Sequence, residues 1–160
     1  MMLRVFSKSD HRGITEDVVL LDSRARSLSR QRVRSEQGRD VVITLPRGTV
    51  LRHGDCLITD NGTLLAVVAM AEPLSRVECI DETDQARAAY HLGNRHASIE
   101  IGVGYVAYER DHVLDALMKR SGLVVTHIDA PFQPEPGAYA AHEWGEPVVI
   151  QARSIPLVEE

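Results

Sequence analysis

The side chains best suited to chemistry in this chain are its histidines, of which there are seven: His11, His53, His91, His96, His112, His127 and His142. Five of these seven lie in the second half of the chain. Neutral imidazole binds nickel, copper and zinc. A lone histidine in a loop is far more often a structural residue than a ligand, however, so residue type alone selects none of them.

The position of each histidine relative to the predicted elements narrows the choice. His96 follows the predicted end of a helix and precedes a strand, so its imidazole can project away from its own domain. His91 lies on the last turn of that helix, where interaction with the helix dipole is expected. His127 lies in a β-prone run, where we expect it to face solvent or a polar neighbour. His11 and His53 lie in turn-like segments, and no role is expected for them.

Common enzyme signatures are missing from the sequence. It has no GxxxxGK[ST] phosphate loop, no GxSxG elbow, no HExxH and no Rossmann glycine fingerprint. No nucleophile–base pair stands out either, so the protein is expected not to be an enzyme. The two cysteines, Cys56 and Cys79, lie in apolar stretches without a CxxC motif, and we expect them to be small buried hydrophobic residues.

Charge is divided unevenly along the chain. Residues 1–75 carry 11 Lys/Arg and 9 Asp/Glu, whereas residues 76–160 carry 7 and 14. This split predicts two modules, of which the acidic one is unsuited to nucleic acid but compatible with metal cations. No apolar run approaches the roughly 18 residues that span a bilayer, and the first residues do not resemble a signal peptide. A cytoplasmic protein that does not enter a membrane is therefore expected.

An arginine-rich run in the first half has two interpretations. In an extended segment, Arg30, Arg32 and Arg34 would lie on one face because side chains alternate along a strand. Nucleic-acid binding would call for aromatic partners, but only 4% of residues are aromatic and none interrupts this run. Docking onto an acidic protein surface and a merely solvated face both remain possible.

The first half has the pattern of a small all-β domain covering residues 1–74. Strand-like stretches begin at Leu3 and cover residues 18–21 and 41–45. Asn61-Gly62 lies between two apolar, β-prone runs and predicts a hairpin with a type I′ turn. No stretch has a helical period, and the domain boundary is expected near Pro73.

The second half has a different pattern. A leading strand at 75–80 precedes a helix that Asp81 or Thr83 caps and that ends at Gly93-Asn94, two residues that tolerate the left-handed conformation of a helix end. Two strands follow at 98–103 and 105–108, and Gly102 and Gly104 permit the reversal between them. A second helix begins near Asp111, ends at Gly122 and carries an apolar stripe formed by Val113, Leu114, Leu117 and Met118.

A last strand over residues 123–128 completes the order βαββαβ. The predicted class is thus α+β: an all-β domain followed by a ferredoxin-like domain over residues 75–135. The prolines at positions 131, 134, 136 and 147, together with Gly137, predict an irregular C-terminal tail over residues 136–160.

Three ordered motifs in the second half resemble those of one known family. They are Tyr90-His91-Leu92-Gly93-Asn94-Arg95-His96, then Asp111-His112-Val113-Leu114-Asp115, then Ala130-Pro131-Phe132 with Pro136-Gly137-Ala138-Tyr139. In order and spacing they resemble the nickel-binding urease accessory proteins of the E type. The similarity is strongest over residues 76 to about 140. In the first half it is diffuse, although Leu21-Asp22-Ser23-Arg24 and the arginines after it look like the family's amino-terminal domain.

This resemblance implies a function and a site. Members of the family are cytoplasmic metallochaperones that deliver Ni²⁺ during urease assembly, working with an accessory GTPase and the urease apoprotein complex. Their first domain is thought to bind a peptide or partner protein, and the second forms a homodimer. The histidine that ends GNRH, here His96, lies at the two-fold axis, so each subunit gives one imidazole to a shared nickel; Zn²⁺ or Cu²⁺ can take its place.

Two further histidines are candidate metal ligands by the same resemblance. Some relatives carry histidine on both sides of the aspartate in the second motif, whereas this chain has Arg110-Asp111-His112, which puts an auxiliary site in doubt. His112 is either a ligand or a residue that packs at the start of a helix. The family often ends in a histidine-rich tail, which this chain lacks. His142 is the one histidine near that region; it is a candidate to fold back and complete the His96 site, and the alternative is that it is not a ligand.

The alternative is a ferredoxin-like nucleic-acid-binding module. It predicts binding that weakens steeply with salt and aromatic residues on the sheet. Neither the charge nor the aromatic content of the sequence favours it.

Overall fold

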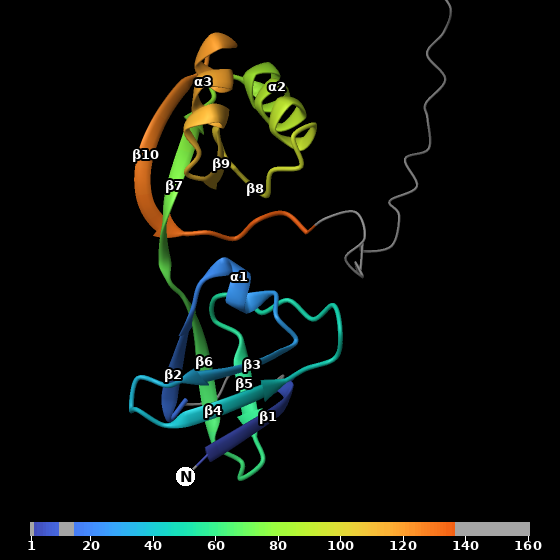
Figure 1. Cartoon of the computed structure of the whole chain (residues 1–160), viewed down its shortest axis with the longest axis vertical. Coiled ribbons are helices and arrows are strands. Elements are labelled where there is room, and N and C mark those ends of the chain that lie inside the picture. Colours follow the sequence, from blue (N-terminus) through green and yellow to red (C-terminus); the bar gives the residue numbers. More distant parts are fainter. Residues whose placement is uncertain (1, 10–14, 137–160) are drawn as a thin grey trace, which may run out of the picture.

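The computed structural model describes residues 2–9 and 15–136. It forms two layered units joined by one long strand, β7 (Ala71–Glu78) (Figure 1). The unit before β7 consists mostly of strands, and the unit after it combines a sheet with two helices, as the sequence predicts. Among the described residues, no helix is long and apolar enough to cross a membrane.

A six-stranded sheet makes up the first unit, in the order β2-β6-β5-β1-β4-β3. Its strands are β1 (Met2–Ser9), β2 (Asp17–Leu21), β3 (Arg30–Arg34), β4 (Asp40–Thr44), β5 (Cys56–Thr59) and β6 (Leu64–Ala69). β1 pairs with β4 and β2 with β6 in parallel, and the other neighbours are antiparallel. Alternate residues of these strands, such as Leu3, Val5, Val41 and Ile43, point into one apolar core.

Two local predictions for this unit are wrong. The hairpin between β5 and β6 exists, but its turn is not type I′, because Gly62 has a positive φ of 85° and Asn61 does not. Instead the Asn61 side chain accepts hydrogen bonds from the Thr59 hydroxyl and the Thr63 amide. The unit also contains a one-turn helix, α1 (Ser23–Arg26), capped by the Asp22 side chain, which is too short to produce a helical period.

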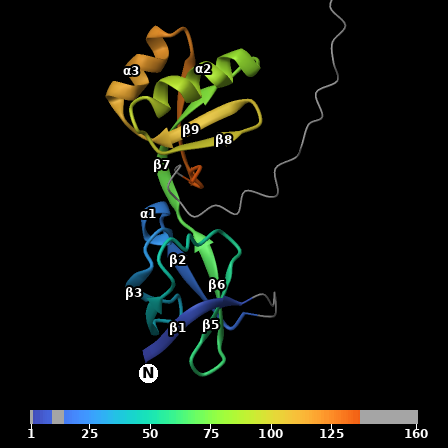
Figure 2. The same ribbon diagram turned by 90° about the vertical axis from the view of Figure 1, so that its right-hand side faces the viewer.

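The second unit is a four-stranded antiparallel sheet in the order β10-β7-β9-β8. Along the chain, α2 (Glu82–Gly93) follows β7, and then come β8 (Ile99–Gly102), β9 (Tyr105–Glu109), α3 (His112–Arg120) and β10 (Val124–Pro131). Both helices lie on the same side of the sheet (Figure 2). They close a core that includes Val77, Ala88, Leu92, Val106 and Met118.

The sequence predictions for this unit hold in most details. Asp81 is the cap of α2, and Asp111 is the cap of α3. Gly102 has no room for a side chain, because an added Cβ would lie 2.0 Å from the Tyr105 ring. The prediction for Val113 is wrong, because this residue is 56% exposed and does not join the apolar stripe of α3, whereas Met118 is fully buried.

After β10 the chain crosses the end of this sheet that faces the first unit, which we call the crossing segment (residues 132–136; Figure 1). Phe132 is fully buried. The Gln133 amide donates to the Glu100 carboxylate, and the Glu135 amide donates to the carbonyl of Ile99 at 2.6 Å. The segment therefore leads from the β10 edge of the sheet to the β8 edge.

Arg26 of α1 ties the crossing segment to the first unit. Its side chain is 1% exposed, and its guanidinium donates to the carbonyl of Phe132 and to the side-chain oxygen of Gln133. Beside it, the Glu72 carboxylate accepts hydrogen bonds from the amide and the hydroxyl of Ser23, both at 2.8 Å. These contacts hold the two units and the crossing segment together at one seam.

Candidate metal site

The end of α2 determines where His96 lies. The His96 amide donates to the carbonyl of Gly93 at 2.9 Å, and the Ala97 amide donates to the carbonyl of Leu92 at 3.2 Å. This pair of hydrogen bonds, closed by a left-handed residue, is the Schellman arrangement that ends many helices. His96 supplies the left-handed residue, with a φ of 56°.

The sequence analysis expected Gly93 or Asn94 to take this conformation, and that prediction is wrong. Asn94 is right-handed, with a φ of −64°, and Gly93 has no positive φ. His96 is the one residue other than glycine with a positive φ in the described part of the chain. The helix end therefore uses a bulky side chain at a position where glycine is the usual residue.

Nothing in the described part of the chain accounts for the imidazole of His96. The residue is exposed, and within residues 2–9 and 15–136 its ring has no hydrogen-bond or ion-pair partner. The left-handed conformation costs about 1 kcal/mol or more for a residue that has a Cβ. His96 thus combines an unfavourable backbone conformation with a ring that has no polar partner among the described residues. Because no hydrogen bond or ion pair of the ring within residues 2–9 and 15–136 offsets that cost, the ring is available for a ligand.

His112 is placed by the cap of α3. The Asp111 side chain accepts hydrogen bonds from the amides of Val113 and Leu114, at 2.7 and 3.1 Å. His112 is the first residue of the helix and is exposed. Asp111 thus caps the helix through its Oδ1 atom, and His112 is exposed to solvent.

Asp115, the last residue of the same motif, has a different role. It is 5% exposed, and its carboxylate accepts a hydrogen bond from the hydroxyl of Tyr108 at 2.8 Å and lies 2.7 Å from Nε2 of His127. His127 on β10 therefore faces a polar neighbour, as predicted. Tyr108 is 1% exposed, so a substrate could not reach its hydroxyl, and the cluster is structural.

The electrostatics of this cluster follow from its burial. Burial alone would raise the pKa of Asp115, but the neighbouring Ser75 hydroxyl and the hydrogen bonds from His127 and Tyr108 lower it. The Ser75 hydroxyl lies near the carboxylate without the geometry of a hydrogen bond. Burial and the bond to Asp115 raise the pKa of Tyr108, which stays neutral. Asp115 is consequently a fixed anion that holds β9, α3 and β10 together.

The described residues do not bring the candidate ligands into one cluster. Across residues 2–9 and 15–136, no group of three or more His, Cys, Asp or Glu side chains is arranged to hold a metal ion. His142 and His11 lie outside the described residues. His91 packs edge-on against the Tyr90 ring at 5.4 Å between centroids, and Nδ1 of His53 accepts from the Ala69 amide. Any metal site that uses His96 must therefore take further ligands from outside this part of one chain.

Sequence reasoning missed the residues at the seam. Arg26 was one of six arginines in a run, and nothing in its spacing indicated that it alone would be buried. Phe132 was the only available signal, since a single aromatic residue among prolines suggests an apolar anchor.

Comparisons with known proteins define the class. Residues 6–70 match the family described as the N-terminal domain of the UreE urease accessory protein, and residues 72–149 match its C-terminal domain. The two matches meet at the start of β7, where one sheet gives way to the other.

Individual relatives agree with the family matches. The urease accessory protein UreE of Alkalilimnicola ehrlichii is 42% identical over 138 residues, which is 86% of this chain and 85% of that protein. The proteins of the same name from Burkholderia vietnamiensis and Ralstonia nicotianae are 48% and 44% identical, over 76% and 79% of this chain. The chain spans about 61% of the length of each of these two relatives. This chain belongs to the UreE family of urease accessory proteins.

Proposed function

We propose that this protein carries nickel during urease maturation and holds Ni²⁺ between two subunits through one His96 from each. Its membership of a family of urease accessory proteins supports a role in urease assembly. Nickel is the cargo that the family resemblance implies, and a neutral imidazole is a ligand that suits it. Zn²⁺ and Cu²⁺ accept the same donor, so either can substitute.

The observation that carries this proposal is the conformation of His96. Glycine adopts a φ of 56° at a helix end without strain, whereas histidine adopts it at a cost in free energy. Strained residues of this kind are concentrated at functional sites. The exposed ring has no partner in the described part of the chain, which leaves both of its nitrogen atoms available to a metal.

A homodimer supplies the second ligand. In an isologous dimer, a residue near the two-fold axis lies opposite its own copy, so one histidine per chain becomes a pair. Two imidazoles leave coordination positions open, unlike a closed structural site. An incomplete site suits a carrier, because a recipient protein can provide the remaining ligands and withdraw the ion.

His142 and His112 are the proposed auxiliary ligands. The crossing segment is hydrogen-bonded to Ile99, three residues after His96. The six residues from 137 to 142 can span about 20 Å when extended, so His142 has the reach to approach His96. His112 is exposed at the start of α3 and is proposed as a weaker, separate site.

The remaining assignments follow from the same proposal. The protein acts as a carrier in the cytoplasm and not as an enzyme, and its partners are the urease accessory GTPase and the urease apoprotein complex. Its domains are proposed as residues 1–74 and 75–135, with a tail over 136–160. The antiparallel order β10-β7-β9-β8 with both helices on one face supports the description of the second domain as ferredoxin-like.

Nickel titration by calorimetry tests the site when it is combined with a measurement of mass in solution. We expect about half a nickel ion per chain, since an isologous pair shares one ion, and a dimer in the presence of nickel. His96→Ala should lose the tightest site and remain folded, because the exposed ring has no hydrogen bond or ion pair in the described part of the chain. A nickel-bound monomer, or an unchanged tightest site in His96→Ala, would refute the proposal.

A further inference from the structure

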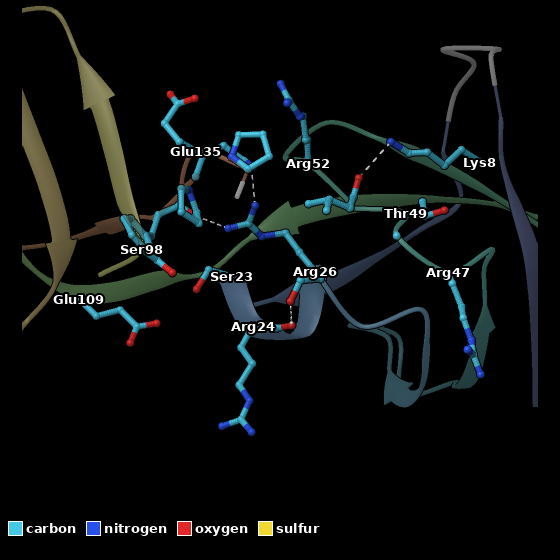
Figure 3. A pocket seen from close by; sticks show the side chains of 17 residues that line it. Lys8, Ser23, Arg24, Arg26, Arg47, Thr49, Arg52, Ser98, Glu109 and Glu135 are labelled. Carbon is cyan, nitrogen blue, oxygen red and sulfur yellow. Dashed lines mark hydrogen bonds between the residues drawn. The ribbon is translucent and has the colours of Figure 1, made fainter. Parts of the chain in front are cut away.

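A pocket of about 1000 Å³ opens at the seam between the two units (Figure 3). The first unit contributes α1, the loop from Arg47 to Val50, Arg52 and Lys8. The second unit contributes Ser98, Glu109 and the crossing segment. The volume is sufficient for a short stretch of polypeptide, since ligand pockets commonly measure about 300 to 1000 Å³. This pocket is built from residues other than those of the candidate metal site.

The wall from the first unit carries cations that the protein itself does not neutralise. Two of the five cations that line the pocket are used internally: Lys8 pairs with Asp55 at 2.7 Å, and Arg26 is buried against the crossing segment. The other three, Arg24, Arg47 and Arg52, are exposed, and their guanidinium groups have no partner among the described residues.

This concentration is not a general property of the first unit. Elsewhere in it, Arg32 pairs with Asp40 and Arg39 with Asp17, and Arg34 donates to the carbonyl of Gly38. In the described part of this unit, only Arg4 and Arg30 also have unpartnered guanidinium groups, and neither lines the pocket. Three of the five free cations thus surround one opening.

The wall contributed by the second unit favours a polypeptide ligand over a nucleic acid. Glu109 and Glu135 are exposed carboxylates on the side of the second unit. They would repel a nucleic-acid backbone, which carries a negative charge at every phosphate. They do not prevent the binding of a polypeptide whose carboxylates lie along the arginine wall and whose neutral or basic residues face the other wall. Arginine also binds carboxylates through two parallel hydrogen bonds.

We infer that this pocket is a docking site for an acidic segment of a partner protein, held by Arg24, Arg47 and Arg52. The site is separate from the proposed nickel site, and the partner contacts both units and the crossing segment at once. Binding is electrostatic and therefore weakens as salt is added.

The test is fluorescence anisotropy with the full-length protein and a labelled Glu-rich octapeptide, with a Gln-rich octapeptide of equal length as the comparison. We expect the Glu-rich peptide to bind more tightly than the Gln-rich one. Arg47→Glu/Arg52→Glu should weaken it by about tenfold or more, because two attractive pairs become repulsive. Nickel binding should stay unchanged in this variant, which separates a failure here from a failure of the proposed metal site.

The matched control is Arg4→Glu/Arg30→Glu. It changes the net charge of the same unit by the same amount and uses the two free arginines outside the pocket. We expect it to reduce affinity by less than about threefold, the effect of net charge alone. Equal losses in both variants would overturn the proposal, as would equal binding of the two peptides. Tighter binding of a single-stranded oligonucleotide through the same arginines would also overturn it.

Discussion

Replacing His96 by glycine tests the backbone strain and the metal site together, because we expect protein stability to rise and nickel affinity to fall. The left-handed φ of 56° costs histidine about 1 kcal/mol or more, whereas glycine adopts it freely. Glycine adds entropy to the unfolded chain, which cancels part of the gain. No hydrogen bond or ion pair of the side chain within the described residues is lost. The net expectation is that His96→Gly raises the free energy of unfolding by about 0.5 to 1 kcal/mol.

Urea denaturation of the metal-free protein measures this change, and the midpoint of a thermal melt should rise by about 1 to 4 °C. The matched control is Asn94→Gly, two residues away. Asn94 has a φ of −64°, so glycine relieves no strain there and should lower stability by about 0.3 kcal/mol. Stabilisation at position 96 with slight destabilisation at position 94 would show that conformation, and not a general effect of glycine, is responsible.

Calorimetric titration with nickel then measures the metal affinity of the two glycine variants. His96→Gly should lose the tightest nickel site although its fold is more stable, and Asn94→Gly should keep that site. The reasoning fails if His96→Gly is less stable than the wild type, because the imidazole would then have a structural role that the contacts do not show. It also fails if the more stable variant still binds nickel as the wild type does.

Two further predictions concern the contacts that support the site. Asp115→Asn should lower the free energy of unfolding by about 1 to 2 kcal/mol at pH 7, since the hydrogen bonds of Tyr108 and His127 lose their charged acceptor. The pKa of Asp115 is lowered, so its contribution is complete above its ordinary value of 3.8 and disappears as the pH falls below it. Urea denaturation at pH 7 and near pH 3 should show the gap between variant and wild type closing at the lower pH, and a constant gap would contradict this assignment. Arg26→Met should cost about 2 kcal/mol, because the buried carbonyl of Phe132 and the part-buried side-chain oxygen of Gln133 lose their donor. Hydrogen exchange should accelerate at the amides of Gln133 and Glu135, and unchanged exchange there would show that the crossing segment is held without Arg26.

Local rules explain why the helices and most strands could be predicted from the sequence. Asp81 and Asp111 each precede a helical stretch and cap it as expected. The alternation of Arg30, Arg32 and Arg34 anticipated an exposed face on a strand, and β3 has that pattern. Each of these features depends on residues close together in the chain.

The predictions that failed concern positions where the local sequence allows two conformations and does not indicate which one forms. Asn61 can either adopt a positive φ or accept hydrogen bonds with its side chain, and here the side chain decides. Gly93 and Asn94 both tolerate a left-handed conformation, but His96 is the residue that adopts it. The hydrogen bonds that close the helix run from the amides of His96 and Ala97 to the carbonyls of Gly93 and Leu92, which requires the left-handed residue at position 96.

Contacts between residues far apart in the chain could not be predicted from the sequence. Arg26 lies 107 positions before Gln133, so no local pattern could show that its guanidinium would be buried at a seam. For the candidate site, the family resemblance led us to propose His96, His112 and His142, and these three remain predictions. The positive φ of His96 and the buried role of Asp115 became visible only in three dimensions.

The hydrogen bonds of the crossing segment have a mechanical consequence. The segment is fastened to α1 by Arg26 and to the outer strand β8 by Gln133 and Glu135. A rotation of one unit against the other must therefore stretch or break these bonds, since no slack loop separates them. A partner that moves the two units apart would therefore also detach the crossing segment from α1 or from β8.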